Sequence, residues 1–325
     1  REIIEEARLY GIKVIPSLDS PGHVDQILDV HPDWGQRDNS GRISESALDI
    51  TNPEAVAYMK SLYKEYMELF NTSDTFHIGA DEYINFQTAN YTYNQVLGSY
   101  AQEQGIGSTW LDAFAYYVND IAEFVHDNGF TPRIWNDGIF YKSTTQNVVM
   151  HDYIEIDYWT RWDYNMTELQ TFIDKGFKKI YNINANYFYY VLRNDQNEAS
   201  FDYPNQEERI FNQWHPGVYC GRGGVDQIVD YREDFVAGSS LAIWCDNAND
   251  SVGDTGIIRD TYYQIRTTAE RSWRVNTDSI KDPLHDDGRG YDVEQGVNGT
   301  YADFMANQLS VSKAPGGHNS DGTID

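Results

Sequence analysis

The stretch Phe76-His77-Ile78-Gly79-Ala80-Asp81-Glu82-Tyr83 carries two adjacent carboxylates at the end of a short apolar run that begins at Thr75. Such a run, with a helical pattern on each side, predicts a buried strand of a parallel sheet. Asp81 and Glu82 then lie at its carboxyl end, where they are either a catalytic pair or two solvated charges. The pattern of the surrounding chain favours the first interpretation.

Helical and strand patterns alternate on both sides of this stretch. The helix before it, at residues 53–70, is marked by Asn52 as a cap, by Pro53 in the first turn and by an apolar stripe. The other predicted helices cover about residues 1–10, 109–128, 167–175, 225–236 and 256–274, and the other strands cover residues 12–18, 131–135, 153–159, 178–184 and 240–244. Strands that are mostly followed by helices predict an α/β fold with a parallel sheet and crossover helices.

Residues able to take part in chemistry follow the apolar part of the predicted strands. They are Asp19 and His23, Asp81 and Glu82, Trp135 and Asp137, Trp159, Tyr189, Trp244 and Asp246. In a β/α barrel the carboxyl ends of all strands form one rim, and this rim carries the active site. A doubly wound open sheet would gather such residues at one switch point instead. We therefore predict a β/α (TIM) barrel.

Composition excludes several classes of partner. The 325 residues carry a formal charge of -27, so nucleic acid and anionic membranes are poor partners. No run of 18 apolar residues is present, and we expect no membrane insertion by this segment. Cys220 and Cys245 form no disulfide framework and are predicted to be free thiols. No cluster has metal-ligand spacing and no glycine-rich phosphate loop precedes a helix, so we expect no cofactor.

The chain is predicted to contain two regions. Residues 1–278 form the barrel, and residues 279–325 form a polar extension with one short helix at about 300–309 and a loose tail from Ala314. A long polar and aromatic loop is predicted at about residues 185–212. Because a helix leads directly into a strand at the very start, we expect the first units of the fold to lie upstream.

Several of these stretches resemble landmarks of the family-20 glycoside hydrolases, which include β-N-acetylhexosaminidases and lacto-N-biosidases. Residues 12–23, which end in Asp19-Ser20-Pro21-Gly22-His23, resemble the third-strand motif of that family. Residues 77–82 resemble its catalytic motif, with Ala80 where many members carry a second glycine. Further similarities lie at residues 48–53, 135–137, 244–246 and 269–273. The resemblance covers about residues 1–275, and the order and spacing of the motifs make it specific.

The resemblance implies an eight-stranded barrel to which this chain contributes about strands three to eight. The first two strands have no counterpart here, and neither has the substrate-gripping arginine that the family usually places on the first of them. A fragment that is weakly active or inactive by itself is one expectation from this departure.

The resemblance also implies unequal roles for the two carboxylates. Glu82 is expected to be the general acid/base, because glycoside cleavage needs a proton delivered to the leaving oxygen. Asp81 is not expected to be a nucleophile, because this family is among the substrate-assisted exceptions. The 2-acetamido oxygen of the substrate would attack the anomeric carbon, and Asp81 would accept a hydrogen bond from the acetamido N–H. A tyrosine hydroxyl after the seventh strand would orient that oxygen, with Tyr189 as first choice, then Tyr187 and Tyr181.

The remaining candidates are expected to surround the sugar. Trp135, Trp159 and Trp244 would wall the pocket, with plain core packing as the alternative for each of them. Asp246 is expected to hydrogen-bond sugar hydroxyls. Asp137 either does likewise or braces another side chain.

Two histidines and one aspartate are weaker candidates. His23 is expected to hydrogen-bond a carboxylate near Glu82, and Asp19 is expected to support His23 or its loop. His77 is expected to pack inside the barrel.

Together these features predict a retaining exo-glycoside hydrolase that releases terminal β-linked GlcNAc or GalNAc from oligosaccharides or glycoconjugates. A lacto-N-biosidase that releases a disaccharide by the same mechanism stays open, because of Ala80 and the aromatic loop at 185–212. Two alternatives remain, a glycan-binding barrel without catalysis and a hydrolase with Asp137 or Asp246 as its nucleophile. An extracellular or cell-surface location is expected, since such glycans occur there.

Overall fold

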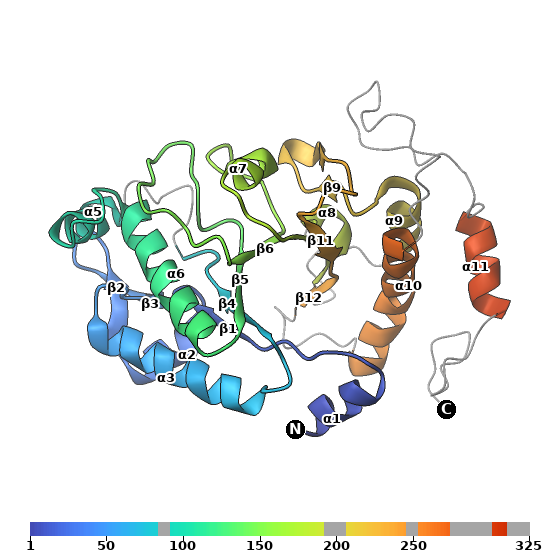
Figure 1. Cartoon of the computed structure of the whole chain (residues 1–325), viewed down its shortest axis with the longest axis horizontal. Coiled ribbons are helices and arrows are strands. Elements are labelled where there is room, and N and C mark those ends of the chain that lie inside the picture. The colour runs from blue at the N-terminus through green and yellow to red at the C-terminus, as the bar shows by residue number, and fades with distance from the viewer. Residues whose placement is uncertain (84–91, 192–205, 245–252, 274–300, 311–325) are drawn as a thin grey trace. The chain divides into compact units, whose positions relative to one another are not determined.

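A computed structural model describes residues 1–83, 92–191, 206–244, 253–273 and 301–310 of the chain. By their contacts the residues form two units, Arg1–Ile180 and Tyr181–Asp325. Figure 1 labels the helices and strands of both units. Each unit is described by itself.

A parallel sheet forms the centre of the first unit. Its strands are, in spatial order, β1 (Ser17–Ser20), β4 (Thr75–Gly79), β5 (Thr131–Trp135) and β6 (Glu155–Tyr158). Every residue of β4 is buried, as its apolar run predicts. Because the strands are parallel, the segments that follow β1, β4, β5 and β6 emerge at the same edge of the sheet.

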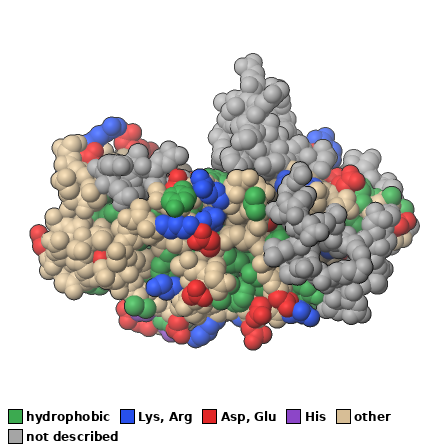
Figure 2. Space-filling view, turned by 90° about the horizontal axis from the view of Figure 1, so that it is seen from above, with side chains coloured by type: hydrophobic (Ala, Val, Ile, Leu, Met, Phe, Trp, Pro, Cys, Tyr) green, Lys and Arg blue, Asp and Glu red, His purple; other side chains and the backbone are tan. Residues whose placement is uncertain are grey.

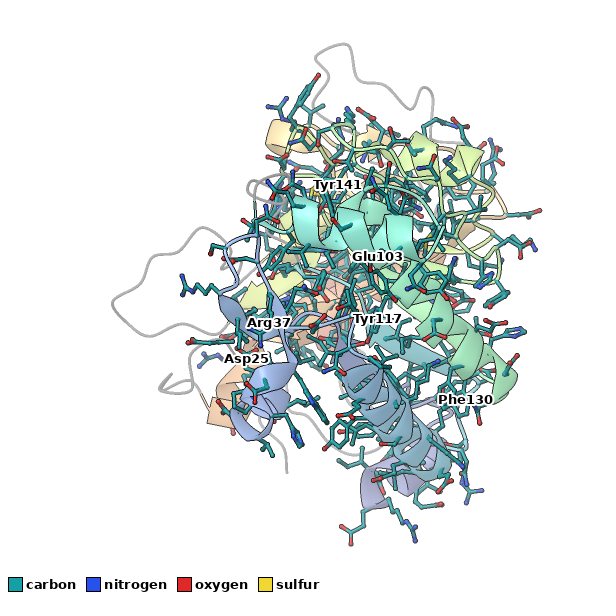
Figure 3. The ribbon with its side chains drawn as sticks, turned by 90° about the vertical axis from the view of Figure 1, so that its left-hand side faces the viewer. Asp25, Arg37, Glu103, Tyr117, Phe130 and Tyr141 are labelled. Carbon is teal, nitrogen blue, oxygen red and sulfur yellow. The ribbon has the colours of Figure 1, made fainter. Side chains whose placement is uncertain are left out.

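Two long crossover helices, α3 (Pro53–Leu69) and α6 (Trp110–Asp127), lie on the same side of these strands (Figure 1). The Asn52 side chain caps α3 by accepting the Glu54 N–H at 2.9 Å, and Thr109 begins α6 with a capping box. Tyr117 of α6 is buried, and its hydroxyl lies 2.8 Å from the Ser20 hydroxyl of β1 (Figure 3). The helix layer is therefore tied to the sheet by a buried hydrogen bond as well as by packing.

The other elements of the first unit are shorter. An antiparallel hairpin consists of β2 (Gly35–Arg37) and β3 (Ile43–Leu48). The remaining elements are α1 (Glu2–Leu9), α2 (Asp25–Val30), the 3-10 turn η1 (Pro32–Trp34), α5 (Asn94–Glu103) and α7 (Leu169–Asp174). The hairpin, α2 and α5 are absent from the predicted alternation.

The second unit contains short paired strands and two longer helices. Here β7 (Ile180–Asn182) neighbours β11 (Val236–Ser239), β8 (Tyr189–Val191) pairs in parallel with β12 (Ala242–Trp244), and β9 (Val218–Tyr219) pairs antiparallel with β10 (Gln227–Ile228). The helical elements are α8 (Ala185–Phe188), α9 (Glu207–Gln213), η2 (Arg222–Gly224), α10 (Gly253–Trp273) and α11 (Tyr301–Ser310). A buried cluster of Tyr187, Phe188, Ile210, Trp214 and Val218 packs this unit.

Most of the predicted elements are confirmed. The helices α1, α3, α6, α7, α10 and α11 lie where the periodicity places them, and so do the strands β4, β5, β6, β7 and β12. Cys220 is a buried thiol. The predicted loose tail from Ala314 and Cys245 lie outside the described residues.

The predicted helix at residues 225–236 is wrong. This segment instead forms β10, a turn and the start of β11. The Asp230 carboxylate accepts the Arg232 N–H at 3.0 Å, which stabilises a turn, and the residues before it pair with β9. Local pairing and turn chemistry thus prevail over a weak helical periodicity.

Two boundaries also differ from the prediction. The strand predicted at 12–18 is β1 at Ser17–Ser20, because Pro16 has no N–H to donate and regular pairing begins only after it. The predicted loop at 185–212 contains α8, β8 and the start of α9, while residues 192–205 lie outside the described part.

Charged side chains are distributed over the surface. Figure 2 shows Asp and Glu scattered over the face it draws, next to Lys and Arg. None of the helices that the structure describes is long and apolar enough to span a membrane.

Candidate active site

The site begins at the turn that follows β4. Gly79, Ala80 and Glu82 have φ angles of +77°, +69° and +44°, which lie in the left-handed region. A residue other than glycine costs about 1–3 kcal/mol there and keeps that conformation only when its surroundings impose it. The structure therefore explains why a second glycine would suit position 80, and it shows that this chain holds Ala80 and Glu82 in strained backbone.

Two glycines from neighbouring loops confine this turn. A Cβ atom on Gly22 would lie 2.6 Å from the Asp81 carbonyl oxygen, and one on Gly138 would lie 2.2 Å from the Ala80 carbonyl oxygen. Real Cβ atoms do not approach backbone so closely, so only glycine fits at either position. The loops after β1 and β5 thus hold the turn between them and fix the direction of its carboxylates.

His23, from the loop after β1, contacts both carboxylates. Its Nε2 atom lies 3.3 Å from Asp81 Oδ2 and 3.4 Å from Glu82 Oε2. A hydrogen bond to Asp81 and a second, smaller contribution from a hydrogen bond to Glu82 raise the pKa of His23 to about 11. Its imidazole is therefore a cation at neutral pH. One cation thus pairs with two adjacent carboxylates and reduces their repulsion.

The surroundings of the two carboxylates differ. The Asp81 side chain is only 12% exposed, whereas that of Glu82 is 41% exposed. Asp81 Oδ1 is buried and has no hydrogen-bond partner among the described residues. A buried carboxylate oxygen without a donor is costly.

Asp137, after β5, is buried behind this pair. Its Oδ2 atom accepts the backbone N–H of Glu82 at 3.0 Å, and its Oδ1 atom accepts the indole N–H of Trp159 at 2.8 Å. Burial is the main cause that raises the pKa of Asp137 to about 7, and repulsion from the charge of Asp81 is the second. Both oxygens bond within the protein, which favours the predicted bracing role over direct contact with a sugar.

Asp19 lies close enough to Asp81 for their charges to interact. Burial, and second the charge of Asp81, raise the pKa of Asp19 to about 6. Its Oδ1 atom accepts the Ser17 hydroxyl at 3.2 Å, and the charge of His23 acts in the opposite direction by favouring ionised Asp19. Asp19 therefore supports its own loop and contributes charge to the site.

Aromatic rings flank the carboxylates in the first unit. The rings of Trp135 and Trp159 meet edge to face, with centroids 6.3 Å apart. The ring of Trp135 also packs against that of His77, with centroids 4.8 Å apart. His77 is buried, and its Nδ1 atom accepts the Gly79 N–H at 3.2 Å, in agreement with its predicted place inside the barrel. Burial lowers the pKa of His77 to about 3, so its imidazole is neutral.

The other predicted site residues belong to the second unit. The rings of Tyr189 and Trp244 contact each other, with centroids 5.6 Å apart. The Tyr187 hydroxyl donates to Asp226 Oδ2 at 3.1 Å, and its ring lies under the Arg209 guanidinium. Asp246 lies outside the described residues.

Spacing along the chain does not reveal some partners that the fold brings together. Tyr141 donates its hydroxyl to the Asp137 carbonyl at 2.7 Å, and Gly138 packs on the Ala80 carbonyl. Gly138 directly follows Asp137, and such a glycine after a strand was the one available signal. Tyr141 offered none, because aromatic residues are common throughout the chain.

His23, Asp81 and Glu82 are also the one group among the described residues with the geometry to share a cation, since one ligand atom of each lies within 4.8 Å of the others. The contact of His23 with a carboxylate at this strand end agrees with the prediction, and the structure shows that both Asp81 and Glu82 take part. In this structure His23 Nε2 lies within hydrogen-bonding reach of both carboxylates.

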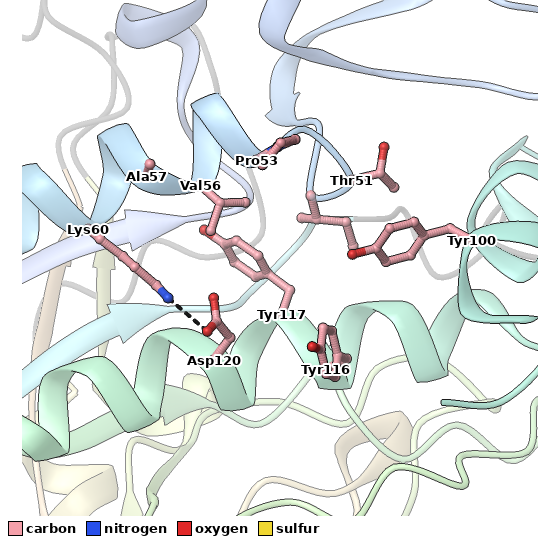
Figure 4. Close-up of a pocket in the computed structure, with 10 residues that line it drawn as sticks. Thr51, Pro53, Val56, Ala57, Lys60, Tyr100, Tyr116, Tyr117 and Asp120 are labelled. Atoms are coloured by element: carbon pink, nitrogen blue, oxygen red, sulfur yellow. Dashed lines mark hydrogen bonds and ion pairs between the residues drawn. The ribbon is translucent and has the colours of Figure 1, made fainter. Parts of the chain in front are cut away.

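A separate hollow lies between α3, α5 and α6 on the helix side of the first unit (Figure 4). Its lining includes Val56, Lys60, Tyr100, Tyr116, Tyr117 and Asp120. Lys60 Nζ and Asp120 Oδ1 pair across it at 2.7 Å. The hollow shares no residue with the carboxylate site, and we assign it no chemical role.

Comparison with known proteins identifies relatives of this arrangement. A family model described as glycosyl hydrolase family 20, catalytic domain, matches residues 1–276. A lacto-N-biosidase of Bifidobacterium bifidum is 32% identical over 329 residues, which cover 97% of this chain and 27% of the relative. A beta-hexosaminidase subunit A1 of Dictyostelium discoideum is 24% identical over 286 residues, which cover 85% of this chain and 46% of the relative. The chain thus spans about a quarter to a half of the length of these relatives.

Solved structures give the same result for the fold. Dispersin B superposes with a TM-score of 0.63 and 25% identity, covering 83% of this chain and 75% of that one. A catalytic module of the pneumococcal exo-beta-D-N-acetylglucosaminidase StrH superposes with a TM-score of 0.65 and 23% identity, covering 86% of this chain and 65% of that one. Together with the family match, these likenesses confirm the predicted α/β barrel fold class.

Proposed function

The chain belongs to glycosyl hydrolase family 20, and we propose that it forms the catalytic part of a retaining exo-glycosidase that cleaves the β-glycosidic bond of an N-acetylhexosamine. The observation that carries this proposal is the unequal pair after β4. Asp81 is buried, with one oxygen that has no donor among the described residues, and Glu82 beside it is half-exposed. This difference supports a role for Asp81 as a hydrogen-bond acceptor and a role for Glu82 in proton transfer.

In the proposed first step the 2-acetamido oxygen of the substrate attacks the anomeric carbon. The bond from this carbon to the leaving oxygen breaks, and Glu82 transfers its proton to that oxygen. An oxazolinium intermediate with a positive charge forms. Asp81 Oδ1 accepts a hydrogen bond from the acetamido N–H and stabilises this charge.

In the second step water attacks the anomeric carbon from the face that the leaving group vacated. Glu82 now takes a proton from this water, and the acetamido oxygen leaves the anomeric carbon. Two displacements at one carbon retain its configuration. His23 acts in both steps by contacting Glu82 and Asp81 at once, which keeps the two carboxylates in a fixed geometry.

Trp135, Trp159 and Trp244 are proposed to contact the sugar. Aromatic rings can stack on the C–H faces of sugars. Asp246 is proposed to bind sugar hydroxyls, since it lies two residues past Trp244, the last residue of β12. The proposed setting is extracellular or at the cell surface, because glycans with terminal N-acetylhexosamine occur there.

Tyr189 is proposed to orient the acetamido oxygen, supported by its contact with Trp244. Tyr189→Phe removes the donor, and we expect kcat for an aryl N-acetylglucosaminide to fall by about 100-fold or more. The matched variant Tyr187→Phe removes a hydroxyl that bonds Asp226, so we expect a lower unfolding temperature and a smaller loss of kcat. The reverse order of the two losses would move the role to Tyr187.

A disaccharide product is the second candidate, and one observation favours it. The lacto-N-biosidase is 32% identical over nearly the whole chain, whereas the Dictyostelium hexosaminidase is 24% identical over less of it. We therefore expect the p-nitrophenyl glycoside of lacto-N-biose to be cleaved with a higher kcat/KM than that of GlcNAc. The assay uses the protein that contains residues 1–325, with free disaccharide measured by chromatography. A higher kcat/KM for the GlcNAc glycoside would assign monosaccharide release.

A glycan-binding barrel without catalysis remains the contrasting hypothesis. It predicts measurable affinity for N-acetylhexosamine glycans without turnover of any of these glycosides.

A further inference from the structure

One buried carboxylate links three consecutive strand ends of the site. Asp137 follows β5, and it accepts hydrogen bonds from Glu82, which follows β4, and from Trp159, which follows β6. The two N–H donors use different oxygens, at 3.0 and 2.8 Å, and the residue is only 2% exposed. The proton donor and one wall of the proposed pocket are therefore joined through a single side chain.

The main chain that carries Asp137 is itself immobilised. The Tyr141 hydroxyl donates to the Asp137 carbonyl at 2.7 Å. Gly138, the next residue, packs so closely on the Ala80 carbonyl that no larger residue fits there. Asp137 is thus held in place, and it in turn holds the Glu82 backbone N–H and the Trp159 indole N–H.

Asn136, which precedes Asp137, binds the backbone of Trp159 and of the next residue. Asn136 Oδ1 accepts the Trp159 N–H at 2.9 Å, and Asn136 Nδ2 donates to the Thr160 carbonyl at 2.8 Å. Asn136 therefore fixes the backbone of Trp159, and Asp137 fixes its indole ring. With both held, the ring has one orientation relative to the strand end of β5.

Glu82 depends on such a constraint. Its backbone lies at a φ of +44°, which is unfavourable for glutamate, and its side chain is 41% exposed. Among the described residues its carboxylate contacts His23. The direction of the Glu82 side chain is therefore set largely by its backbone, and the Asp137 hydrogen bond holds that backbone.

A purely structural role is the competing explanation, and Asp112 illustrates it. Asp112 is fully buried and accepts backbone N–H groups of Ser108 at 3.0 Å and Val148 at 3.2 Å, but it lies at the start of α6. Asp137 differs because a third carboxyl stands beside Asp81 and Glu82, where their charges repel it. Such an arrangement is costly for stability, and functional sites are where costs of this kind are retained.

Resting on the proposed function, we infer that Asp137 is a positioning residue for proton transfer, which holds the Glu82 backbone and the Trp159 indole at a fixed separation. Trp159 in turn meets Trp135 edge to face, so a sugar packed against this pair of rings presents its glycosidic oxygen at a constant distance from Glu82. Displacements of about 1 Å in such geometry can cost about 100-fold in rate.

The test uses leaving groups of different basicity on the protein that contains residues 1–325. A dinitrophenolate leaves without protonation, whereas phenolate and a sugar alkoxide need a proton from Glu82. Asp137→Asn replaces one acceptor oxygen by an N–H₂ group that cannot accept from either donor. We expect kcat/KM, which reports the first step, to fall by about 100-fold for the phenyl N-acetylglucosaminide and for chitobiose, and by less than about 5-fold for the 3,4-dinitrophenyl substrate.

The matched control is Asp112→Asn, a buried carboxylate in the same unit and outside the site. We expect it to lower the unfolding temperature and to affect all leaving groups equally. An equal loss on all leaving groups in Asp137→Asn would overturn the inference and leave the proposed function intact. Absence of turnover on every N-acetylhexosaminide by the parent protein would instead contradict the proposed function.

A second variant covers the case in which Asp137→Asn does not fold. Trp159→Phe removes only the indole donor and keeps the bond from Asp137 to Glu82. We expect a leaving-group-dependent loss in this variant too, smaller than in Asp137→Asn. The same loss on dinitrophenyl and phenyl substrates would show that Trp159 acts as a pocket wall alone and would refute the coupling.

Discussion

Glu82→Gln is expected to lower kcat for the phenyl N-acetylglucosaminide by about 10²–10⁴-fold, the range that general acid–base catalysis contributes. Glutamine keeps the shape of the side chain and can still accept a hydrogen bond from His23. It cannot deliver a proton to the leaving oxygen, and it cannot take one from water in the second step. The measurements are kcat and kcat/KM with phenyl and dinitrophenyl substrates at neutral pH, because kcat/KM reports the first step alone.

The pattern across substrates makes this result specific. The first step should be nearly normal with a dinitrophenyl substrate, because its leaving group needs no proton. Glu123→Gln is a matched control, since Glu123 is exposed on α6 and lies outside the site. A Glu82→Gln protein with parental kcat on the phenyl substrate would remove Glu82 from the mechanism.

Asp81→Asn is expected to lower kcat by about 10²–10³-fold, as for the loss of one preorganised group that stabilises developing charge. Asparagine can accept the acetamido N–H, but it lacks the negative charge opposite the oxazolinium. The effect should appear in kcat more than in KM, because this charge develops only in the transition state. Thiazoline analogues resemble the cyclic intermediate, so their affinity should fall in parallel.

Asp120→Asn is the matched control for this second variant. Asp120 pairs with Lys60 on the helix side and has no contact with the carboxylate site. We expect it to leave both kcat and thiazoline affinity unchanged. An Asp81→Asn protein that lost turnover but bound the thiazoline as tightly as its parent would argue against contact between Asp81 and the acetamido group.

Much of the fold follows from local signals in the sequence. Asn52 with Pro53 and Thr109 with Asp112 mark the starts of α3 and α6, and the apolar run from Thr75 marks β4. The failures have physical causes. Residues 225–236 form strands and a turn because pairing with β9 decides their conformation, and such pairing is invisible in a single segment.

The sequence predicted the chemical groups of the candidate site, but it did not predict the hydrogen bonds and close packing that hold them in place. The contact of His23 with Glu82 agrees with the prediction, because each follows the end of a parallel strand. The two acceptor roles of Asp137 depend on distances between three loops, which no spacing along the chain encodes. The strain at Ala80 and Glu82 depends likewise on the glycines that confine the turn.

The most direct test of substrate-assisted cleavage compares two glycosides that differ only at C2. The protein that contains residues 1–325 is assayed with p-nitrophenyl β-N-acetylglucosaminide and with p-nitrophenyl β-glucoside, whose 2-hydroxyl group cannot form an oxazolinium. If the acetamido group is the nucleophile that Asp81 supports, the first is hydrolysed and the second is not measurably cleaved. Comparable kcat/KM values for the two glycosides would contradict this mechanism.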